Sequence, residues 1–541
     1  MKIKSIFYMA AAAALFTSCV HNLNTVPLNP TDVTSETAYG ADEAGYVQGL
    51  TKIYNQLVSN DTQDLQVDNA GASEFIRAFW SIQEISADAA KCAWGDPWVQ
   101  DINNNTWKGD VLNDAVYAVY VRTLQGITFT NEYMRQTTPE KLQLRGVSSE
   151  LAAKVEQYRA EARFLRAYFY WAAMDTFGKV PFSTEDTPFG GGYNPPQKPA
   201  NEIFNFIVSE LEYLASDESP MPAAQSNYPR VDKGSCLGLL ARVYLNAEVY
   251  SGTAKWAEAK ATCEKIYNLG YALAPTHAEL FRGDNGENPA AKKEFLFAAA
   301  YDAVHIQSYG GTTYMTASTV SADDGPANIN GTTNGWAGNR VPDHFVQTYF
   351  SPSSADFTTG EYDIKDKRGH YFYIKGRQQS MEGKLDSFIN GWSFLKYNNV
   401  PHDMDPVDFA ATAATKSFSD IDFPLIRLGE IHLIYAEACM HIGGNASAQI
   451  KQLAQRAGVN APGSIDADFL MAERARELMW EGHRRTDLIR FGKWISGYNW
   501  TYKGGNFAGQ DLPKHFTLYP IPVTELATNL DLEQNDGYAG R

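Results

Sequence analysis

The sequence predicts a mostly α-helical protein, in which paired helices form a scaffold around a long, loop-rich insertion. Apolar residues recur at helical spacing through most of the first 275 residues and again between residues 426 and 494. Residues 276–424 lose this periodicity and contain many glycine and other turn-forming residues. We therefore expect a helical N-terminal part over residues 19–275 and a C-terminal part over residues 276–541, whose insertion at 276–424 carries the binding site.

Six helices are predicted in the N-terminal part, at residues 42–58, 113–135, 151–175, 203–214, 233–250 and 256–269. The segment 151–175 has the clearest pattern. Arg159, Arg163 and Arg166 share one narrow face there, while aromatic and aliphatic side chains fill most of the rest. Because an apolar stripe of this width cannot be covered from one side, we expect the helix to pack on more than one side.

The predicted helices at 233–250 and 256–269 form a pair across Ser251 and Gly252. Small and large apolar residues alternate along the pair, which resembles a tetratricopeptide unit. Residues 426–442 repeat this composition and end at Gly443-Gly444. Within the insertion, residues 294–300 and 371–375 are predicted as short strands.

The first residues predict a signal peptide over residues 1–18. Lys2 and Lys4 precede an apolar run at residues 6–16, which is too short to span a bilayer. The run ends in Thr17-Ser18-Cys19, which resembles a lipobox, so Cys19 is the expected lipidation site. An ordinary secretory signal followed by an incidental cysteine is the alternative. The polar residues 19–40 suit an extended tether to the membrane.

Charge and cysteine content exclude several classes of function. The formal net charge of −17 argues against binding to nucleic acid and against direct adsorption to anionic lipid. The other cysteines, at 92, 236, 263 and 439, are scattered and predict neither a zinc site nor a disulfide framework. Those at 236, 263 and 439 lie in helical apolar patterns and are expected to be small core residues.

The stretch 305–340 is the candidate binding segment. It is nearly uncharged, and Tyr309, Tyr314 and Trp336 each lie beside glycine or a small polar residue. A sugar ring has an apolar face that stacks on an aromatic ring and hydroxyls that need polar partners. The composition is therefore typical of a site for a neutral amphipathic ligand. The alternative is that these rings only pin the loop onto its own domain.

Two groups of acidic residues are candidates for other chemistry. Glu473, Glu477 and Glu481 recur at i+4 on one predicted helix face, among several arginines. Two of these carboxylates could serve as the acid and base of a glycosidase. Residues stacked along one helix leave little room for a sugar, however, so we favour interhelical salt bridges with the arginines. The oxygen-rich loop from Asp284 to Glu287 is either a Ca²⁺ site or a solvated turn.

Three motifs together resemble the SusD/RagB family. They are the signal that ends at Cys19, residues 159–181 (RAEARFLRAYFYWAAMDTFGKVP), and residues 480–492 (WEGHRRTDLIRFG). The family consists of glycan-binding outer-membrane lipoproteins. The resemblance implies a fold with four tetratricopeptide-like units, a cell-surface location through a lipid anchor, and a SusC-like TonB-dependent transporter as partner.

The loops resemble those of the starch-binding member of this family. The resemblance implies that Trp94, Tyr309 and Trp336 form an arc of stacking rings. It also implies that Arg77 contacts sugar, with weaker matches at Asn69 and Asp96, and that Asp284, Glu287 and Asp420 form a possible calcium region. We therefore expect a non-catalytic protein that binds starch or malto-oligosaccharides, requires no cofactor and delivers its ligand to the transporter. The alternatives are another glycan or a peptide as ligand, or a glycoside hydrolase.

Overall fold

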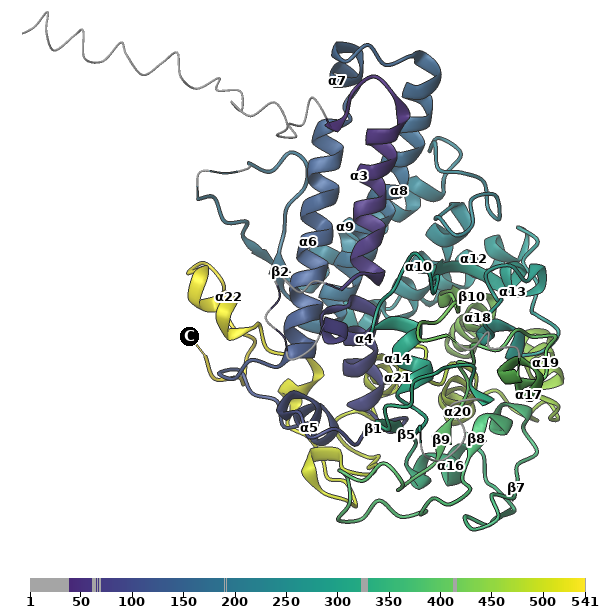
Figure 1. Cartoon of the computed structure of the whole chain (residues 1–541). Helices are drawn as coiled ribbons and strands as arrows, with labels where there is room; N and C mark the ends of the chain where they lie inside the picture. Colours follow the sequence, from purple (N-terminus) through teal and green to yellow (C-terminus); the bar gives the residue numbers. More distant parts are fainter. Residues whose placement is uncertain are drawn as a thin grey trace, which may run out of the picture.

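The computed structural model describes residues 38–60, 65, 67, 70–188, 190, 192–322, 329–411 and 416–540. The predicted signal peptide, Cys19 and Asn69 lie outside these residues. Figure 1 shows long helices that rise from a larger body, in which shorter helices, loops and small strand pairs alternate. The prediction of a mostly α-helical scaffold with a loop-rich insertion is confirmed.

Four long helices form the elongated upper part of the molecule (Figure 1). They are α3 (Glu43–Val58), α6 (Asp114–Gln136), α8 (Ser149–Phe177) and α9 (Ala200–Ala215). The helix α6 packs against α8, α8 packs against α9, and α3 contacts both α6 and α8. All four correspond to predicted helices, and their ends differ from the predicted ends by only a few residues.

The helix α8 shows how the sequence specifies this arrangement. Ser148 caps its N-terminus, and Gly178, with φ of +71°, ends it. Nearly all side chains in its C-terminal half are buried, as the wide apolar stripe predicts. On the arginine face, Arg166 is buried and Arg163 is partly exposed, and both pair with Glu210 of α9, at 3.3 and 2.7 Å respectively.

The stack of helices continues beyond α9. The helix α10 (Lys233–Leu245) packs against α9 and α12 (Trp256–Tyr267), and α12 packs against α18 (Leu428–Ile442). Such neighbour-to-neighbour packing is the arrangement of tetratricopeptide-like pairs. The predicted helix at 233–250 is divided at Asn246, because α10 ends at Leu245 and α11 (Ala247–Ser251) begins at Ala247. The Asn246 side chain hydrogen-bonds back to the preceding turn, which competes with continuation of the helix.

The remaining helical segments are short and lie around the body. The α-helices are α4 (Phe75–Trp80), α5 (Pro97–Asn104), α7 (Pro139–Leu144), α13 (Pro289–Glu294), α14 (Gly311–Ala317), α16 (Asp343–Tyr349), α17 (Pro406–Ala411), α19 (Ser447–Ala457), α20 (Ala467–Glu477), α21 (Arg484–Arg490) and α22 (Val523–Thr528). The 3₁₀ and π segments are η1 (Ala70–Ser73), η2 (Ser81–Ile85), η3 (Ala278–Phe281), η4 (Lys367–Tyr371), η5 (Lys503–Gly505) and η6 (Lys514–Thr517).

Strands occur among the described residues as five antiparallel pairs. The pairs are β1 (Lys91–Cys92) with β5 (Asn339–Arg340), β2 (Val180–Pro181) with β3 (Gln197–Lys198), β4 (Phe295–Ala299) with β10 (Phe423–Arg427), β6 (Ser354–Ala355) with β7 (Tyr362–Asp363), and β8 (Phe372–Tyr373) with β9 (Ser393–Phe394). The predicted strands at 294–300 and 371–375 correspond to β4 and β8. Residues 426 and 427, predicted as the start of a helix, instead end β10, because they pair with β4.

Buried charges connect β10 to the helices around it. Arg427 contacts Glu294 at 3.0 Å, Glu477 at 2.7 Å and Glu481 at 2.6 Å, and none of these side chains is more than 1 % exposed. Burial alone would raise the pKa of Glu477, but the guanidinium groups of Arg456 and Arg427 hold it well below its usual value. The interpretation of these glutamates as partners in salt bridges is confirmed.

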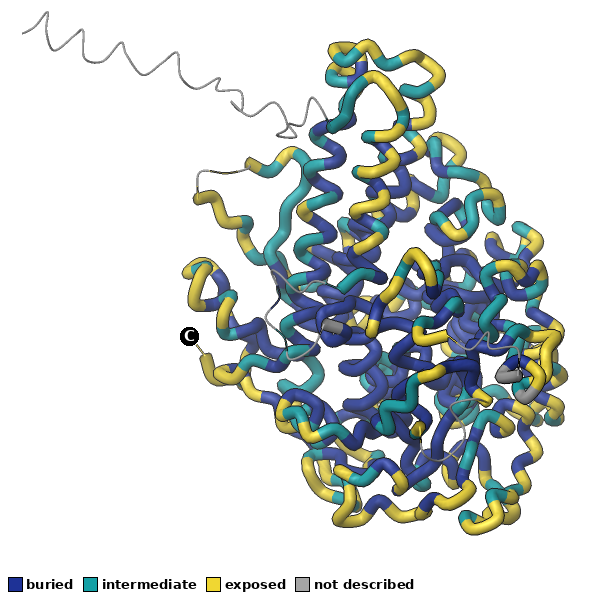
Figure 2. The backbone as a smooth tube through the Cα atoms, in the orientation of Figure 1, coloured by how far each residue is buried: buried dark blue, intermediate teal, exposed yellow. Residues whose placement is uncertain are grey.

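The main core runs through the body and along the inner sides of the long helices (Figure 2), and a smaller second cluster lies among α18, α19 and α20. Cys92, Cys236, Cys263 and Cys439 are buried thiols, as expected of small core residues. In the part of the chain that the structure describes, no helix has both the length and the apolar character needed to cross a membrane. The division of the chain at residues 275 and 276 stays a prediction.

The buried network around Arg427 predicts a large effect on stability. Arg427→Ala leaves three buried carboxylates short of a partner, so we expect the free energy of unfolding to fall by about 3–5 kcal/mol. Urea denaturation followed by circular dichroism measures this change. Lys255→Ala is the control, because it removes an exposed pair with Glu258 and is expected to cost less than about 1 kcal/mol. Equal effects of the two substitutions would contradict the assignment.

Candidate functional site

The segment around Tyr309 places a ring on the surface just before α14. Tyr309 is 50 % exposed, whereas its neighbours on both sides are buried. Two glycines make this possible. A Cβ at Gly310 would lie 2.3 Å from Glu74 Oε2, and one at Gly311, where φ is +45°, would lie 2.0 Å from the hydroxyl of Tyr301. The chain can therefore approach the core closely enough to turn the Tyr309 ring outward.

A buried carboxylate lies directly beneath this segment. Glu74 accepts hydrogen bonds from the hydroxyls of Ser308 and Tyr301. Burial raises the pKa of Glu74 to about 7, although these hydrogen bonds and the charges of Arg122 and Arg77 act in the opposite direction. The carboxylate thereby anchors the backbone that presents Tyr309.

Arg77 also lies beneath the site rather than at its surface. It is 3 % exposed, its Nη1 donates to the carbonyl of Tyr309 at 3.4 Å, and its guanidinium lies 4.5 Å from the ring centre of Tyr314 and 5.4 Å from that of Trp94. These contacts make Arg77 a support for the rings. Its predicted hydrogen bond to a sugar stays a prediction.

Trp94 and Trp336 are brought together by the β1–β5 pair. The two strands pair Lys91 with Arg340 and Cys92 with Asn339. The half-buried Trp94 follows β1, and the half-buried Trp336 precedes β5. The indole Nε1 of Trp94 donates to the backbone oxygen of Trp336 at 3.2 Å. A Cβ at position 338 would lie 2.6 Å from the Trp94 ring, so glycine is needed at this close approach.

Four aromatic side chains gather here, and we call them the aromatic arc: Trp336, Tyr309 and Phe418, whose rings are neighbours, and Trp94, which is joined to Trp336 by its indole hydrogen bond. The ring centres of Tyr309 and Trp336 lie 6.2 Å apart with an interplanar angle of 50°. Those of Tyr309 and Phe418 lie 5.2 Å apart at 51°. The three predicted rings therefore converge, from segments more than 200 residues apart at the extremes. Tyr314, by contrast, is buried and supports the arc from below.

Phe418 was not predicted from the sequence. Its segment is fastened to the loop before Trp336: Thr333 N donates to Lys416 O at 3.1 Å, and Asn334 Nδ2 donates to Ser417 O at 2.9 Å. The available signal was an aromatic residue between two serines, which is the same small, polar setting that marks Tyr309 and Trp336.

The remaining predicted contact residues have different outcomes. Asp96 is half-buried and stands at the N-cap position of α5, two residues after Trp94. It is close in sequence to the arc, and its contact with a ligand stays a prediction. Asn69 lies outside the described residues, so its predicted role stays a prediction as well.

The predicted calcium residues do not form one set. Asp284 accepts hydrogen bonds from the backbone and ring of His402. Asp420 is engaged by Lys416 Nζ at 2.7 Å and by the backbone N of Ala303 at 3.1 Å. The residues whose possible ligand atoms do gather within 4.8 Å, among those described, are Asp284, His402 and Asp403. Glu287 is exposed and outside that group. A structural calcium ion stays a prediction.

Comparisons with known proteins agree with this architecture. A sequence model of the SusD family matches residues 293–538. The chain is 31 % identical to the starch-binding protein SusD of Bacteroides thetaiotaomicron, over 99 % of both chains. It is 25 % identical to SusD-like protein P2 of Formosa agariphila, over 73 % of this chain and 76 % of that protein.

Solved structures show the same fold. A SusD superfamily protein from Parabacteroides distasonis superposes with a TM-score of 0.67 at 19 % identity, covering 94 % of this chain and all of that one. The surface glycan-binding protein A of Bacteroides thetaiotaomicron, solved with laminarihexaose, superposes with a TM-score of 0.66 at 18 % identity, covering 91 % of this chain and 98 % of that one.

The buried carboxylate beneath Tyr309 predicts a pH dependence of stability. The pKa of Glu74 is raised in the folded protein above the ordinary 4.5. Its contribution to stability is therefore fully present below about pH 4.5 and is lost as the pH rises towards about 7. Glu74→Gln removes this titration. We expect the wild type to lose on the order of 2–3 kcal/mol relative to the variant across that window.

Urea denaturation at several pH values between 4.5 and 8 measures this difference. Glu150→Gln, at an exposed position of α8, is the control and should follow the wild type. Parallel pH profiles for the wild type and Glu74→Gln would contradict the prediction.

Proposed function

This chain belongs to the SusD family, and on that premise we propose that it is a non-catalytic binding protein for starch and malto-oligosaccharides. The observation that carries the proposal is the aromatic arc, which consists of four partly exposed rings on loops that pack against the body. The ring centres of Tyr309 and Trp336 lie 6.2 Å apart, and those of Tyr309 and Phe418 lie 5.2 Å apart. An α-1,4-glucan presents the apolar faces of successive sugar rings, on which neighbouring aromatic rings can stack. The identity of 31 % with the starch-binding protein SusD over nearly the whole chain supports this choice of ligand.

The polar groups near the arc suit a neutral ligand. Thr333, Asn334 and Ser417 lie beside the rings and are at least partly exposed. Hydroxyl and amide groups of this kind exchange hydrogen bonds with sugar hydroxyls. The charged Arg77 is withdrawn beneath the rings. The arc therefore offers ring faces and neutral polar groups to a glycan.

The expected affinity of such an arc is low. If each ring removes roughly 50 Å² of apolar sugar surface from water, at about 25 cal/mol per Å² it contributes about 1.2 kcal/mol. Three or four rings then supply about 4–5 kcal/mol, which corresponds to a dissociation constant near 1 mM. Weak binding suits a protein that passes its ligand on.

We also propose that the protein works at the outer membrane, as the lipid-anchored partner of a SusC-like TonB-dependent transporter. The pattern that ends at Cys19 supports the anchor, and the polar residues 19–40 supply a tether. The family membership supports a transporter as the destination of the glycan. Radiolabelled palmitate incorporation, compared between the wild type and Cys19→Ala, is the direct test of the anchor.

The proposal of a non-catalytic role rests on the state of the acidic residues. Glu473 pairs with Arg368 at 2.8 Å, and Glu477 and Glu481 are the partners of Arg427. Carboxylates held in buried ion pairs cannot act as a general acid and base on a sugar. Absence of reducing-sugar release during prolonged incubation with glucan is the expected result.

Removal of a ring from the centre of the arc is expected to abolish detectable starch binding. Trp336→Ala and Tyr309→Ala each remove about 1.2 kcal/mol, which weakens a millimolar interaction about tenfold. Retention on native affinity gels that contain starch, pullulan, dextran or inulin measures the effect and identifies the preferred glycan. Tyr193→Ala, an exposed tyrosine outside the arc, should migrate as the wild type does. Unchanged retention of Trp336→Ala on starch would contradict the site, and preferential retention on another glycan would change the ligand.

Phe418 is expected to belong functionally to the arc. Phe418→Ala should weaken binding of malto-oligosaccharides severalfold, because one stacking face is lost, while Phe418→Tyr should retain most of the affinity. Isothermal titration calorimetry with maltoheptaose distinguishes the variants. Equal affinities for the wild type and Phe418→Ala would exclude Phe418 from the site.

A further inference from the structure

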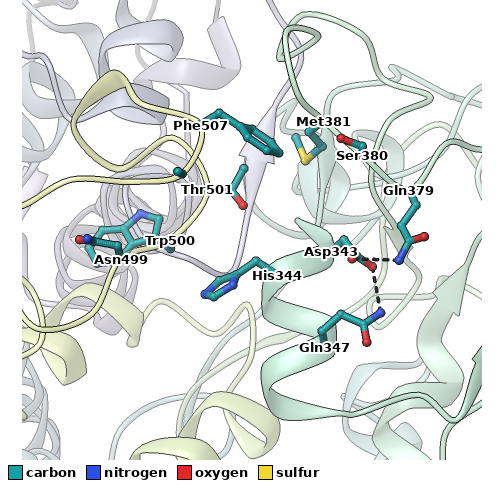
Figure 3. A pocket seen from close by; sticks show the side chains of 11 residues that line it. Asp343, His344, Gln347, Gln379, Ser380, Met381, Asn499, Trp500, Thr501 and Phe507 are labelled. Atoms are coloured by element: carbon teal, nitrogen blue, oxygen red, sulfur yellow. Dashed lines mark hydrogen bonds between the residues drawn. The ribbon is translucent and has the colours of Figure 1, made fainter.

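A second concave site lies away from the aromatic arc, in the lower part of the body. Figure 3 shows a cavity between the N-terminus of α16, the loop at residues 379–381 and the loop at residues 499–508. Its volume is about 510 Å³, within the range of about 300–1,000 Å³ that small-molecule sites occupy. It shares no lining residue with the arc.

The lining combines apolar faces with neutral polar groups. Phe507 is half-buried, whereas Trp500 and Met381 are buried in the wall, and Phe507 and Met381 face each other at one end of the cavity (Figure 3). Amides and hydroxyls line the rest, and those of Gln379, Ser380 and Asn499 are exposed at the rim. An amphipathic lining of this kind is complementary to a sugar, whose apolar face and hydroxyls need both types of group.

The charged residues that line the cavity favour a neutral ligand over an anion. Among the described residues that line it there is no lysine or arginine, so phosphate and other anions have no counter-charge. Asp343 supplies a carboxylate whose oxygens accept from Trp392 Nε1 at 2.9 Å, Gln347 Nε2 at 3.2 Å and Gln379 Nε2 at 2.9 Å. Three N–H donors already compensate this charge, and about one of its four acceptor positions remains for a ligand hydroxyl.

The two loops that close the cavity are held in place before any ligand arrives. The hydroxyl of Tyr502 donates to Met381 O at 2.8 Å and so ties one loop to the other. Tyr502 itself has φ of +67°, a conformation that costs a non-glycine residue energy and persists only when its surroundings impose it. A preformed wall lowers the cost of ordering on binding.

Two lining side chains also carry a polar atom that lacks a protein partner. Trp500 is 1 % exposed, and its indole Nε1 has no hydrogen-bond acceptor among the described residues; the same holds for Nε2 of His344, which extends from α16 towards Trp500 (Figure 3). An unpaired buried polar group costs about 1–3 kcal/mol. Both atoms are buried behind the cavity surface, so a ligand hydroxyl could reach them only after a side chain moves.

We propose that this cavity is a second saccharide site, which takes a neutral sugar of one or two rings or the end of a longer chain. The ligand class follows from the lining, whereas the choice of maltose as the first probe rests on the proposed function. The cavity and the arc share no lining residue, so each site can be changed by substitution without removing a side chain of the other.

Fluorine NMR of protein labelled with 5-fluorotryptophan tests this site. The experiment uses Trp94→Ala/Trp336→Ala as background, which removes binding at the arc, and the Trp500 resonance is assigned with Trp500→Phe. Titration with maltose should shift the Trp500 resonance along a saturable curve. In the same background, Gln379→Ala and Phe507→Ala should each raise the dissociation constant about tenfold, whereas Gln157→Ala, an exposed amide on α8, should leave it unchanged.

The outcomes separate this proposal from the proposed function. In one outcome, the wild type binds starch while maltose, cellobiose and glucose all leave the Trp500 resonance unmoved. That result would contradict the second saccharide site and leave the proposed function of the arc intact. A shift produced by glucosamine alone would overturn the neutral ligand class. A shift by maltose that Gln379→Ala and Phe507→Ala leave unchanged would also overturn the assignment. If the wild type retains no glycan on affinity gels, the proposed glycan binding by the arc is wrong. The Trp500 titration then still shows whether the cavity binds a sugar.

Discussion

The position of Arg427 is the constraint on which the loop-rich half of the structure depends. Its guanidinium faces three carboxylates in an almost solvent-free environment, so each charge has to keep its partners. Glu294 directly precedes β4, and Arg427 is the last residue of β10. The network therefore fixes both ends of the segment between these strands, which contains Tyr309, Trp336 and Phe418. The loops have little regular structure of their own, so their positions depend on the helices and strands to which their ends are attached.

Within that frame, close backbone contacts decide where the rings point. Gly310 and Gly338 stand where a Cβ would overlap Glu74 and the Trp94 ring, respectively. The chain is therefore drawn inward at these positions, and the adjacent Tyr309 and Trp336 are left partly exposed. Arg77 and Tyr314 fill the space below the rings, so the surface row rests on a packed layer. Such a layer restrains the rings before a ligand arrives, which lowers the entropic cost of binding.

The long helices could be predicted from the sequence because their signals are local. The apolar stripe of α8, the cap at Ser148 and the stop at Gly178 all lie within or beside the helix itself. The prediction failed where a distant partner decides the conformation. Residues 426 and 427 continue a helical pattern in the sequence, yet they pair with β4, more than 120 residues earlier.

Some residues of the site could likewise be predicted from local sequence, and others could not. Trp94, Tyr309 and Trp336 could be named from their polar, glycine-rich surroundings and from family resemblance. The burial of Arg77 could not be foreseen from the sequence. All six residues of the short helix α4 are buried, so the helix has no polar face that would distinguish exposed from buried positions. Phe418 was missed because its ring neighbour Tyr309, and the loop residues Thr333 and Asn334 that bond to Ser417, are more than 80 residues away. The cavity beside Trp500 draws on three separate segments, none of which carries a motif.

The arc and the cavity differ in shape, and this difference bears on how a long glucan is held. Rings arranged along a surface accept an internal segment of a chain, because nothing blocks the chain at either end. A cavity of about 510 Å³ that is open at its rim has room for a short sugar or for the end of a chain. Two weak contacts on one protein act together on a polymer that can reach both, since the second contact forms at a high effective concentration. A short oligosaccharide reaches only one of them and leaves quickly. Retention would then depend on chain length without any tight site, which lets a capture protein hold a polymer and still release its fragments.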